Sequence, residues 1–120
     1  MKVIVAGSRD FCDLSLVKEA FKDLEGVTEI ISGGANGADS LGEIYAENND
    51  IKLTVMNADW DQYGKGAGHI RNGQMAEYGD MAVIFWDSVS KGTENMIKQM
   101  KKFKKPCVII RYTENDLEEW

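Results

Sequence analysis

The chain has 120 residues, which is enough for one domain with a buried core and too few for two. Its formal net charge of -6 argues against a protein that grips a nucleic-acid backbone, since such proteins usually carry a basic face. Two cysteines far apart in sequence, Cys12 and Cys107, indicate neither a disulfide framework nor a metal site. No apolar stretch approaches the ~20 residues of a membrane span, and we expect a cytoplasmic protein.

Apolar runs alternate with helical periods along the chain. Strands are predicted at residues 2–6, 27–32, 51–56, 81–86 and 106–111. Helices are predicted at residues 14–24, 38–48, 69–78 and 93–103. Residues 57–68 are predicted to be a long irregular stretch, and residues 113–120 an acidic tail with one short helical turn at most. Cys107 belongs to an apolar strand and is predicted to lie in the core, whereas Cys12 is predicted to be exposed.

This alternation predicts an α/β fold, a three-layer Rossmann-like sandwich with a mainly parallel sheet of about five strands and helices on both faces. We assign residues 1–112 to a single domain and residues 113–120 to the tail. In such folds, ligands bind beyond the carboxyl ends of the strands, where the strand order reverses. Glycine-rich or polar clusters follow the first four strands, so we expect them to meet at one rim.

The run Gly33-Gly34-Ala35-Asn36-Gly37 joins the second strand to a helix. Such a turn lets backbone N–H groups approach a phosphate, helped by the positive end of the helix dipole, but an ordinary turn has the same composition. Asp39, in the first helical turn, is expected either to cap the helix or to accept hydrogen bonds from ribose hydroxyls. A carboxylate there would repel a phosphate placed beside it.

Two further clusters can hold an anion. Arg9, after Gly7-Ser8, can pair with a phosphate in a fork geometry or pack on a loop carboxylate. The run Ser90-Lys91-Gly92-Thr93 offers hydroxyl, ammonium and helix N–H donors, although its Ser or Thr is also an ordinary N-cap. The other lysines that follow it recur at helical spacing and are read as a solvated helix face.

The third helix contains few core residues, so Arg71 and Asn72 are expected to face the rim. Trp60, Tyr63 and Trp86 either stack on a base or belong to the core. Among these aromatics, Trp86, followed by Asp87 at a strand end, is expected to reach the site. His69 is read as a surface residue or a helix cap.

Taken together, these segments resemble the YspA/YpsA-related branch of the SLOG superfamily. The resemblance is carried, in order, by Gly7-Ser8-Arg9, Ser32-Gly33-Gly34-Ala35-Asn36-Gly37-Ala38-Asp39, Ala58-Asp59-Trp60, Tyr63-Gly64-Lys65, Ala67-Gly68-His69-Ile70-Arg71-Asn72-Gly73-Gln74-Met75, Phe85-Trp86-Asp87 and Ser90-Lys91-Gly92-Thr93. That superfamily is Rossmann-like and includes DprA/Smf and the Lonely Guy phosphoribohydrolases. The resemblance implies a nucleotide-derived ligand in the rim pocket and a homo-oligomer, a dimer or larger, in a bacterial cell or encoded by a phage.

The Lonely Guy enzymes cleave an N-glycosidic bond with an Arg-x-x-x-Met helix and a Gly-x-Gly-Thr-x-x-Glu turn. Arg71 and Met75 match the first motif, and Gly92-Thr93 match part of the second. Met96, however, stands where that family has its glutamate. Cleavage through a ribosyl cation needs a carboxylate near the sugar, so the catalytic candidates are Arg71 with Asp87, Glu94 or Asp39.

The sequence therefore predicts a protein that binds a nucleotide-derived molecule, ADP-ribose-like or cyclic, as a sensor, carrier or sequestering protein. The alternative is a phosphoribohydrolase-like enzyme, and single-stranded DNA binding is the third possibility. The predicted ligand-binding residues are Gly7, Ser8, Arg9, Gly33, Gly34, Ala35, Asn36, Gly37, Asp39, Arg71, Asn72, Trp86, Asp87, Ser90, Lys91, Gly92 and Thr93. No cofactor is expected, and neither a nucleic acid nor a membrane is expected as a partner.

Overall fold

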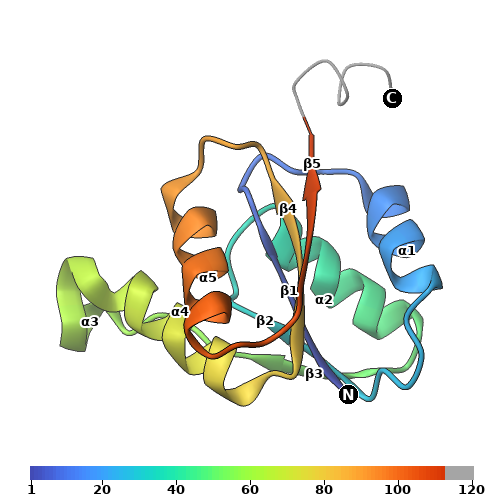
Figure 1. Ribbon diagram of the computed structural model, residues 1–120, viewed down its shortest axis with the longest axis horizontal. Helices are drawn as coiled ribbons and strands as arrows, with labels where there is room; N and C mark the ends of the chain where they lie inside the picture. The colour runs from blue at the N-terminus through green and yellow to red at the C-terminus, as the bar shows by residue number, and fades with distance from the viewer. Residues whose placement is uncertain (113–120) are drawn as a thin grey trace.

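The sheet has five parallel strands in the order β3-β2-β1-β4-β5 (Figure 1). The structure is a computed structural model that describes residues 1–112, and the predicted acidic tail lies outside the described residues. The strands are β1 (Lys2–Gly7), β2 (Glu29–Ser32), β3 (Lys52–Val55), β4 (Met81–Trp86) and β5 (Cys107–Arg111). The helices are α1 (Leu14–Lys22), α2 (Ala38–Asn48), α3 (Trp60–Tyr63), α4 (Ala67–Tyr78) and α5 (Lys91–Lys102), with a 3₁₀ turn at Gly64–Gly66.

Helices α1 and α2 lie on one face of the sheet, and α4 and α5 lie on the other (Figure 1). In the central strand β1, Val3 and Val5 pack with α1 and α2, whereas Ile4 and Ala6 pack with α4 and α5. Both faces of β1 are therefore buried, which is why the strand needs apolar residues along its length. The predicted three-layer Rossmann-like fold is confirmed.

Side-chain caps fix the beginnings of two helices. Oδ1 of Asp13 accepts from the amides of Ser15 and Leu16 at the start of α1, at 3.0 and 3.3 Å. Ser90 caps α5 in the same way through the amide of Thr93. These contacts satisfy backbone donors that the helix itself leaves without acceptors. The cap on α5 also places the first turn of that helix at the carboxyl edge of the sheet.

Two predictions of local structure are wrong. Residues 57–68 are not irregular, because Asp59 caps the short helix α3 and the 3₁₀ turn then leads into α4 two residues before the predicted start. The last strand is also less buried than its apolar sequence predicts, with Val108 44% exposed and Ile109 37% exposed. The physical reason is that β5 is an edge strand, and Cys107 is accordingly only half-buried. Cys12 is exposed, as predicted.

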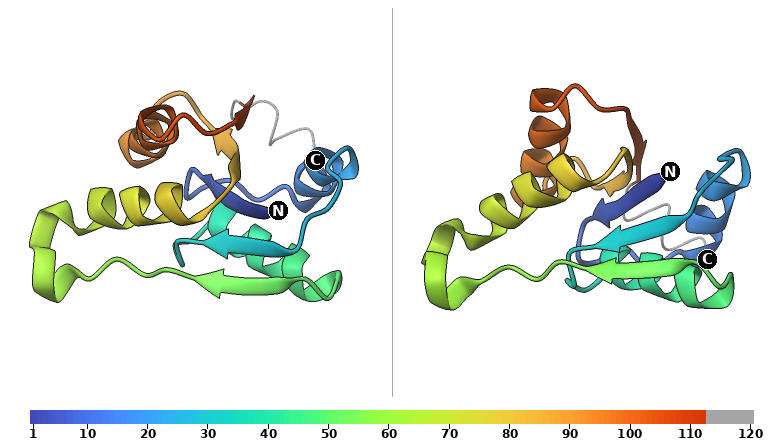
Figure 2. Two further views of the ribbon diagram at one scale, coloured as in Figure 1. Left: turned by 60° about the horizontal axis from the view of Figure 1, so that its bottom comes forward. Right: turned by 90° about the horizontal axis from the view of Figure 1, so that it is seen from below.

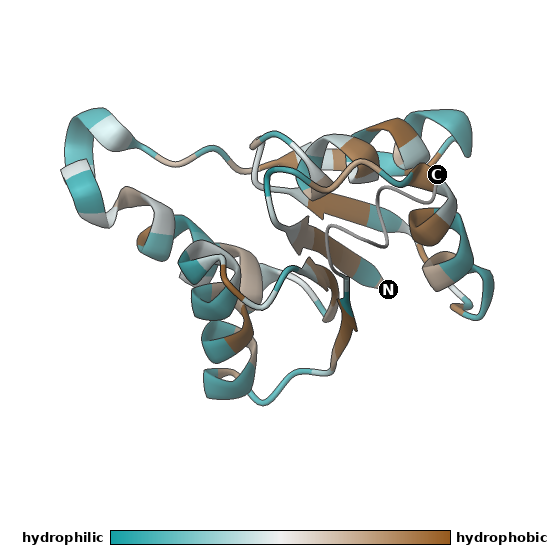
Figure 3. Cartoon of the chain, turned by 90° about the horizontal axis from the view of Figure 1, so that it is seen from above, coloured by the Kyte–Doolittle hydropathy of each residue, from teal (hydrophilic) through white to brown (hydrophobic). Residues whose placement is uncertain are grey.

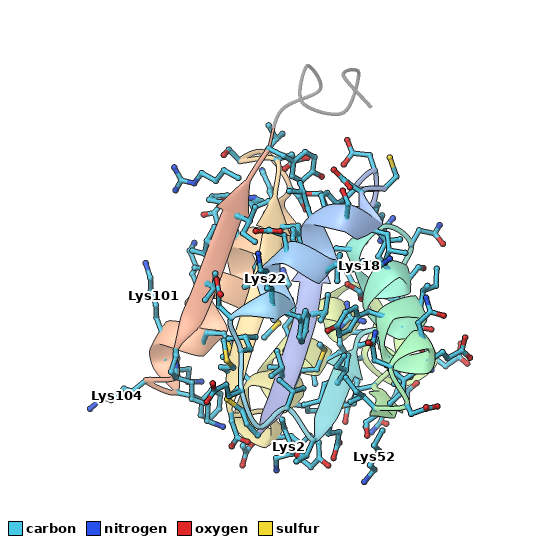
Figure 4. The ribbon with its side chains drawn as sticks, turned by 90° about the vertical axis from the view of Figure 1, so that its right-hand side faces the viewer. Lys2, Lys18, Lys22, Lys52, Lys101 and Lys104 are labelled. Atoms are coloured by element: carbon cyan, nitrogen blue, oxygen red, sulfur yellow. The ribbon has the colours of Figure 1, made fainter. Side chains whose placement is uncertain are left out.

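Residues 57–68 form an arm that carries α3 away from the sheet (Figure 2). Figure 3 shows that the strands are mostly apolar, whereas the arm is mostly polar or neutral. In Figure 4, Lys52 on β3, Lys101 near the end of α5 and Lys104 in the loop after α5 extend away from the body of the molecule. Within residues 1–112, no helix has the length and apolar character needed to cross a bilayer.

Candidate functional site

A pocket opens at the carboxyl edge of the sheet, where the strand order reverses between β1 and β4. We call it the central pocket; its volume is about 100 Å³. Loops after β1, β2 and β4 contribute to its wall, together with α4 and the first turns of α5. Nine of the predicted ligand-binding residues line it: Gly7, Arg9, Ala35, Asp39, Arg71, Asn72, Ser90, Gly92 and Thr93.

Two neighbouring hollows extend the site. The outer hollow, of about 370 Å³, shares Arg9, Ala35 and Arg71 with the central pocket and reaches the arm. It also contains three more predicted residues, Gly33, Gly34 and Asn36. The side hollow is lined by Ser8, Arg9, Asp10, Asp87, Ser90 and Gly92. The rim predicted from the strand ends is therefore a continuous group of hollows that share Arg9.

Arg71 is the side chain that joins α4 to the glycine turn. Its Nη1 donates to the carbonyl oxygen of Gly33 at 2.6 Å, and its Nε donates to Oδ1 of Asn72 at 3.1 Å. Burial lowers the pKa of the guanidinium; nearby Asp39 acts in the opposite direction and Arg9 in the same one. Arginine stays protonated under these influences, because its ordinary pKa lies above 12. The pocket wall therefore contains a half-buried, fixed positive charge.

Asn72 is a positioning residue rather than a free ligand group. Its Nδ2 donates to the carbonyl of Gly92 at 3.2 Å and to Oδ1 of Asn95 at 3.1 Å, while its Oδ1 accepts from Arg71. The side chain is 7% exposed, so these bonds satisfy a buried amide. Asn72 therefore links α4 to the start of α5 and fixes the orientation of the Arg71 guanidinium.

The glycine turn uses part of its own backbone donors internally. The amide of Gly34 donates to Oγ of Ser32 at 3.0 Å, and the amide of Ala35 donates to Oδ2 of Asp39 at 3.2 Å. Gly37 has a φ of +79°, and a Cβ there would collide with the backbone carbonyls of Ser8 and Arg9. Gly37 is thus required for close packing on the loop after β1. The amides of Gly34 and Ala35 already have acceptors, which weakens the phosphate-cradle hypothesis for this turn.

Asp39 does not cap α2, because the N-cap residue is Gly37 and no side chain bonds the helix amides there. Instead its carboxylate holds the glycine turn, and only 5% of the residue is exposed. Burial raises its pKa to about 6, although the amides of Ala35 and Gly33 and the charge of Arg71 act in the opposite direction. Asp39 is the one carboxylate among the residues that line the central pocket.

The loop after β4 is shaped by Asp87. Its Oδ1 accepts from the amides of Val89 and Ser90 at 2.9 and 2.7 Å, and its own amide donates to Oγ of Ser8 at 3.2 Å. Burial acts to raise the pKa of Asp87, but these hydrogen bonds outweigh it and hold the pKa below the usual value. Asp87 is therefore ionised at neutral pH and connects the loops after β1 and β4.

Trp86, Lys91 and Glu94 line neither the central pocket nor either of its two neighbouring hollows. Trp86 supports the loop, since its Nε1 donates to the carbonyl of Ser90 at 3.1 Å and the Arg111 guanidinium lies over its ring. Lys91 and Glu94 line a separate hollow with His69, and Glu94 pairs with Lys98 at 3.2 Å. A carboxylate engaged there is poorly placed to act together with Arg71.

Met96 and Trp60 lie at the site, although neither belongs to the predicted ligand set. Met96 is 1% exposed and lines the central pocket, so a thioether stands where the Lonely Guy resemblance implies a carboxylate. Trp60 lines the outer hollow and is 55% exposed, although a large aromatic in a small domain is expected in the core. The clue for Trp60 was its position among glycines and polar residues rather than in an apolar run.

The arrangement of charge favours an anion. Arg9 and Arg71 both line the central pocket and the outer hollow, and within residues 1–112 no carboxylate lies within 4 Å of either guanidinium. The first turn of α5, at Gly92 and Thr93, faces the same pocket with the positive end of its dipole. Two unpaired guanidinium groups beside a helix N-terminus form a site suited to a phosphate.

Comparisons with known proteins find a family and a relative with similar sequences. A sequence model of the YspA, cpYpsA-related SLOG family matches residues 1–63, which include β1, β2, the glycine turn and the start of the arm. The chain is also 30% identical over 118 residues to the Gene 61 protein of Mycobacterium phage D29, covering 89% of this chain and 94% of that protein. No solved structure matches the chain.

Proposed function

The chain belongs to the YspA, cpYpsA-related SLOG family, and we propose that its central pocket and outer hollow bind a phosphorylated nucleotide derivative. Membership in this family suggests a nucleotide-related function. The observation that carries the proposal is the pair Arg9 and Arg71, which lies between the first turn of α5 and the outer hollow. The role would be that of a sensor, a carrier or a sequestering protein for an ADP-ribose-like or cyclic nucleotide.

The two hollows differ in what they can accept. The central pocket, at about 100 Å³, is small and contains the helix N-terminus, so it suits a phosphate group. The outer hollow, at about 370 Å³, falls in the range of small-molecule sites, roughly 300–1,000 Å³. Because Arg9 and Arg71 border both, a phosphate in the central pocket would leave the rest of the nucleotide in the outer hollow.

Asp39 fits the sugar better than the phosphate. An ionised carboxylate repels a neighbouring phosphate, whereas it accepts hydrogen bonds from ribose hydroxyls. Its Oδ2 lies against Gly33, where a Cβ would come within 2.8 Å of that oxygen and 2.7 Å of Nη1 of Arg71. A ribose near Gly33 would therefore meet a carboxylate and a guanidinium together.

The carboxylate of Asp39 and the guanidinium of Arg71 also support a second candidate function, which is hydrolysis of an N-glycosidic bond. An aspartate with a pKa of about 6 holds a proton more readily at neutral pH than an ordinary aspartate, as a general acid must. Asp39 is a better candidate for the general acid than Asp87 or Glu94, because Asp87 accepts hydrogen bonds from the backbone of its own loop and Glu94 pairs with Lys98. Met96 in the pocket wall weighs against this function, since it supplies no carboxylate.

A chromatographic experiment separates binding from cleavage. The protein is incubated with AMP, ADP, NAD⁺, ADP-ribose, cyclic AMP and cyclic ADP-ribose, and both the free and the protein-bound fractions are analysed after denaturation. Binding alone predicts that a bound nucleotide is recovered intact in stoichiometric amount. Free base released over many turnovers, and lost in Asp39→Asn, would establish the enzyme instead. If no nucleotide is retained or cleaved, neither function stands for these compounds.

A further inference from the structure

Trp60 is an exposed indole on a segment that contributes little to the core. It begins α3, a helix of four residues, and α3 lies at the far end of the arm in both views of Figure 2. None of the residues of α3 is buried. An indole that stays 55% exposed forgoes most of the stabilisation that burial of such a side chain would give. Core packing therefore does not account for Trp60.

The indole is nevertheless held in place. A Cβ at Gly68 would lie 3.6 Å from Cη2 of Trp60, which puts the ring in contact with the first turn of α4. The edge of the ring therefore lies beside the helix, at a distance where a side chain at position 68 would make an ordinary van der Waals contact. The backbone that carries Trp60 is also fixed, because Oδ1 of Asp59 accepts from the amide of Gln62 at 3.1 Å. The aromatic surface is positioned before any ligand arrives.

The outer hollow lies between this indole and a strip of glycine backbone. Its wall includes Gly33 and Gly34 on the side of β2 and Trp60 with Ala58 on the side of the arm. The side chain of Asn57 packs against Gly34, in the space that a Cβ at that position would need. Small residues on one side and an aromatic ring on the other form a space suited to a flat heterocycle.

The charges of the site set the direction of a bound molecule. Phosphate is attracted to Arg9, Arg71 and the first turn of α5, which lie around the central pocket. The outer hollow is the space that continues from these arginines to the arm. Arg9 and Arg71 border both spaces, whereas the first turn of α5 lines the central pocket, so a ligand that fills both would place its phosphate at that turn and its uncharged planar group beside Trp60.

We propose that Trp60 stacks on the base of the bound nucleotide, with the phosphate at the first turn of α5. This inference rests on the function proposed above and deepens it, because it makes a purine or pyrimidine ring a requirement for tight binding. A sugar phosphate without a base would fill only the phosphate end of the site.

Calorimetric titrations with AMP, ADP-ribose and ribose 5-phosphate test the inference. Trp60→Ala is expected to weaken the affinity for AMP and ADP-ribose roughly tenfold to a hundredfold, the range found when stacking aromatics are removed. The affinity for ribose 5-phosphate is expected to change less than twofold. Trp60→Phe, which keeps an aromatic ring, is expected to retain most of the affinity for AMP. Tyr63→Ala is the matched control, since Tyr63 is an exposed aromatic of the same arm that does not line the outer hollow.

Each contrary result has its own meaning. Undiminished AMP binding by Trp60→Ala, with loss of binding in Arg71→Ala, would overturn the stacking role and leave the proposed function standing. An equal loss for ribose 5-phosphate would show that Trp60 only supports the arm, which also overturns the inference. If the wild-type protein binds none of the three compounds, the inference fails together with the nucleotide site from which it starts.

Discussion

Nη1 of Arg71 donates to the carbonyl oxygen of Gly33 at 2.6 Å, so a side chain of α4 closes onto the turn after β2. The two residues are 38 positions apart in sequence. The bond makes Arg71 both a structural link and a charge at the pocket, which changes what its removal should do. Replacement of a residue used only for binding would leave the free energy of unfolding unchanged, whereas replacement of Arg71 removes the donor that bonds the carbonyl of Gly33.

Arg71→Ala is expected to weaken nucleotide binding roughly tenfold to a hundredfold, since a hydrogen bond to a charged group contributes about 1.5–3 kcal/mol. The free energy of unfolding is expected to fall by only about 1 kcal/mol, because solvent can reach the half-buried Gly33 contact. Urea unfolding and calorimetry measure the two effects. Lys18→Ala removes one positive charge from exposed α1 and should change neither (Figure 4). A loss of several kcal/mol in stability with unchanged binding would make Arg71 purely structural.

Gly37→Ala is expected to destabilise the fold by about 2 kcal/mol or more. The methyl group would collide with the carbonyl of Ser8, and the φ of +79° is unfavourable for any residue with a Cβ. Gly66→Ala is the matched control, because Gly66 has a φ of -84° and nothing lies within 4 Å of its Cβ position. That substitution should be neutral or slightly stabilising. Equal thermal midpoints for the two variants would refute the packing role of Gly37.

Asp39 should make stability depend on pH in a direction opposite to that of an ordinary salt-bridged aspartate. Its pKa is about 6 in the folded protein and 3.8 in the reference state, so the folded protein binds more protons between these values. Its contribution to stability is therefore present below pH 4 and is lost as the pH rises through 6. The difference between the two pKa values corresponds to a change of roughly 3 kcal/mol in the free energy of unfolding across this pH range.

Asp39→Asn removes this titration. The free energy of unfolding of Asp39→Asn, measured relative to that of the wild type, is expected to be higher at pH 7 than at pH 4 by up to roughly 3 kcal/mol. Taking the difference between the two proteins cancels the opposite trend of Glu29 and Asp87, whose pKa values are lowered. Urea unfolding at the two pH values measures it, and a difference that does not change with pH would contradict the raised pKa.

Tyr112→Phe should loosen the loop that carries Arg9. The hydroxyl of Tyr112 donates to Oδ1 of Asp10 at 2.7 Å, and the ring packs on Phe11. Removing the hydroxyl keeps the packing, so the expected loss of stability is about 1 kcal/mol. Amide hydrogen exchange should rise in residues 8–12. Tyr63→Phe, at an exposed site on the arm, is the control and should change neither measurement; an identical exchange pattern in Tyr112→Phe would argue against the anchor.

The sequence allowed the fold to be predicted because the central strands β1 and β4 are apolar on both faces and the helices α1 and α5 each have one apolar stripe. The beginning and end of α2 and of β4 agree with prediction to the residue. The exposure of β5 was not predictable in this way, since an apolar run does not show whether a strand lies at an edge. Neither was α3, whose four residues give no measurable period.

At the site, the rule that ligands bind beyond the strand ends brought Arg9, Arg71 and Ser90 together correctly. Sequence reasoning did not reveal which donors were already used. Ser32 and Asp39 accept from the glycine turn, and those bonds depend on side chains folding back from β2 and α2. The role of Trp60 at the outer hollow depends in turn on how the arm folds, because its position among glycines and polar residues indicates exposure but does not show which hollow it lines.

The central claim is that the pocket between β1 and β4 binds a phosphorylated nucleotide derivative through Arg9 and Arg71. Calorimetric titration of the wild-type protein, Arg71→Ala and Lys18→Ala with AMP, ADP, NAD⁺, ADP-ribose, cyclic AMP and cyclic ADP-ribose tests it most directly. The account predicts that at least one compound binds the wild type and Lys18→Ala equally and binds Arg71→Ala at least tenfold more weakly. Absence of binding by every compound at millimolar concentration, or equal binding by all three proteins, would contradict it.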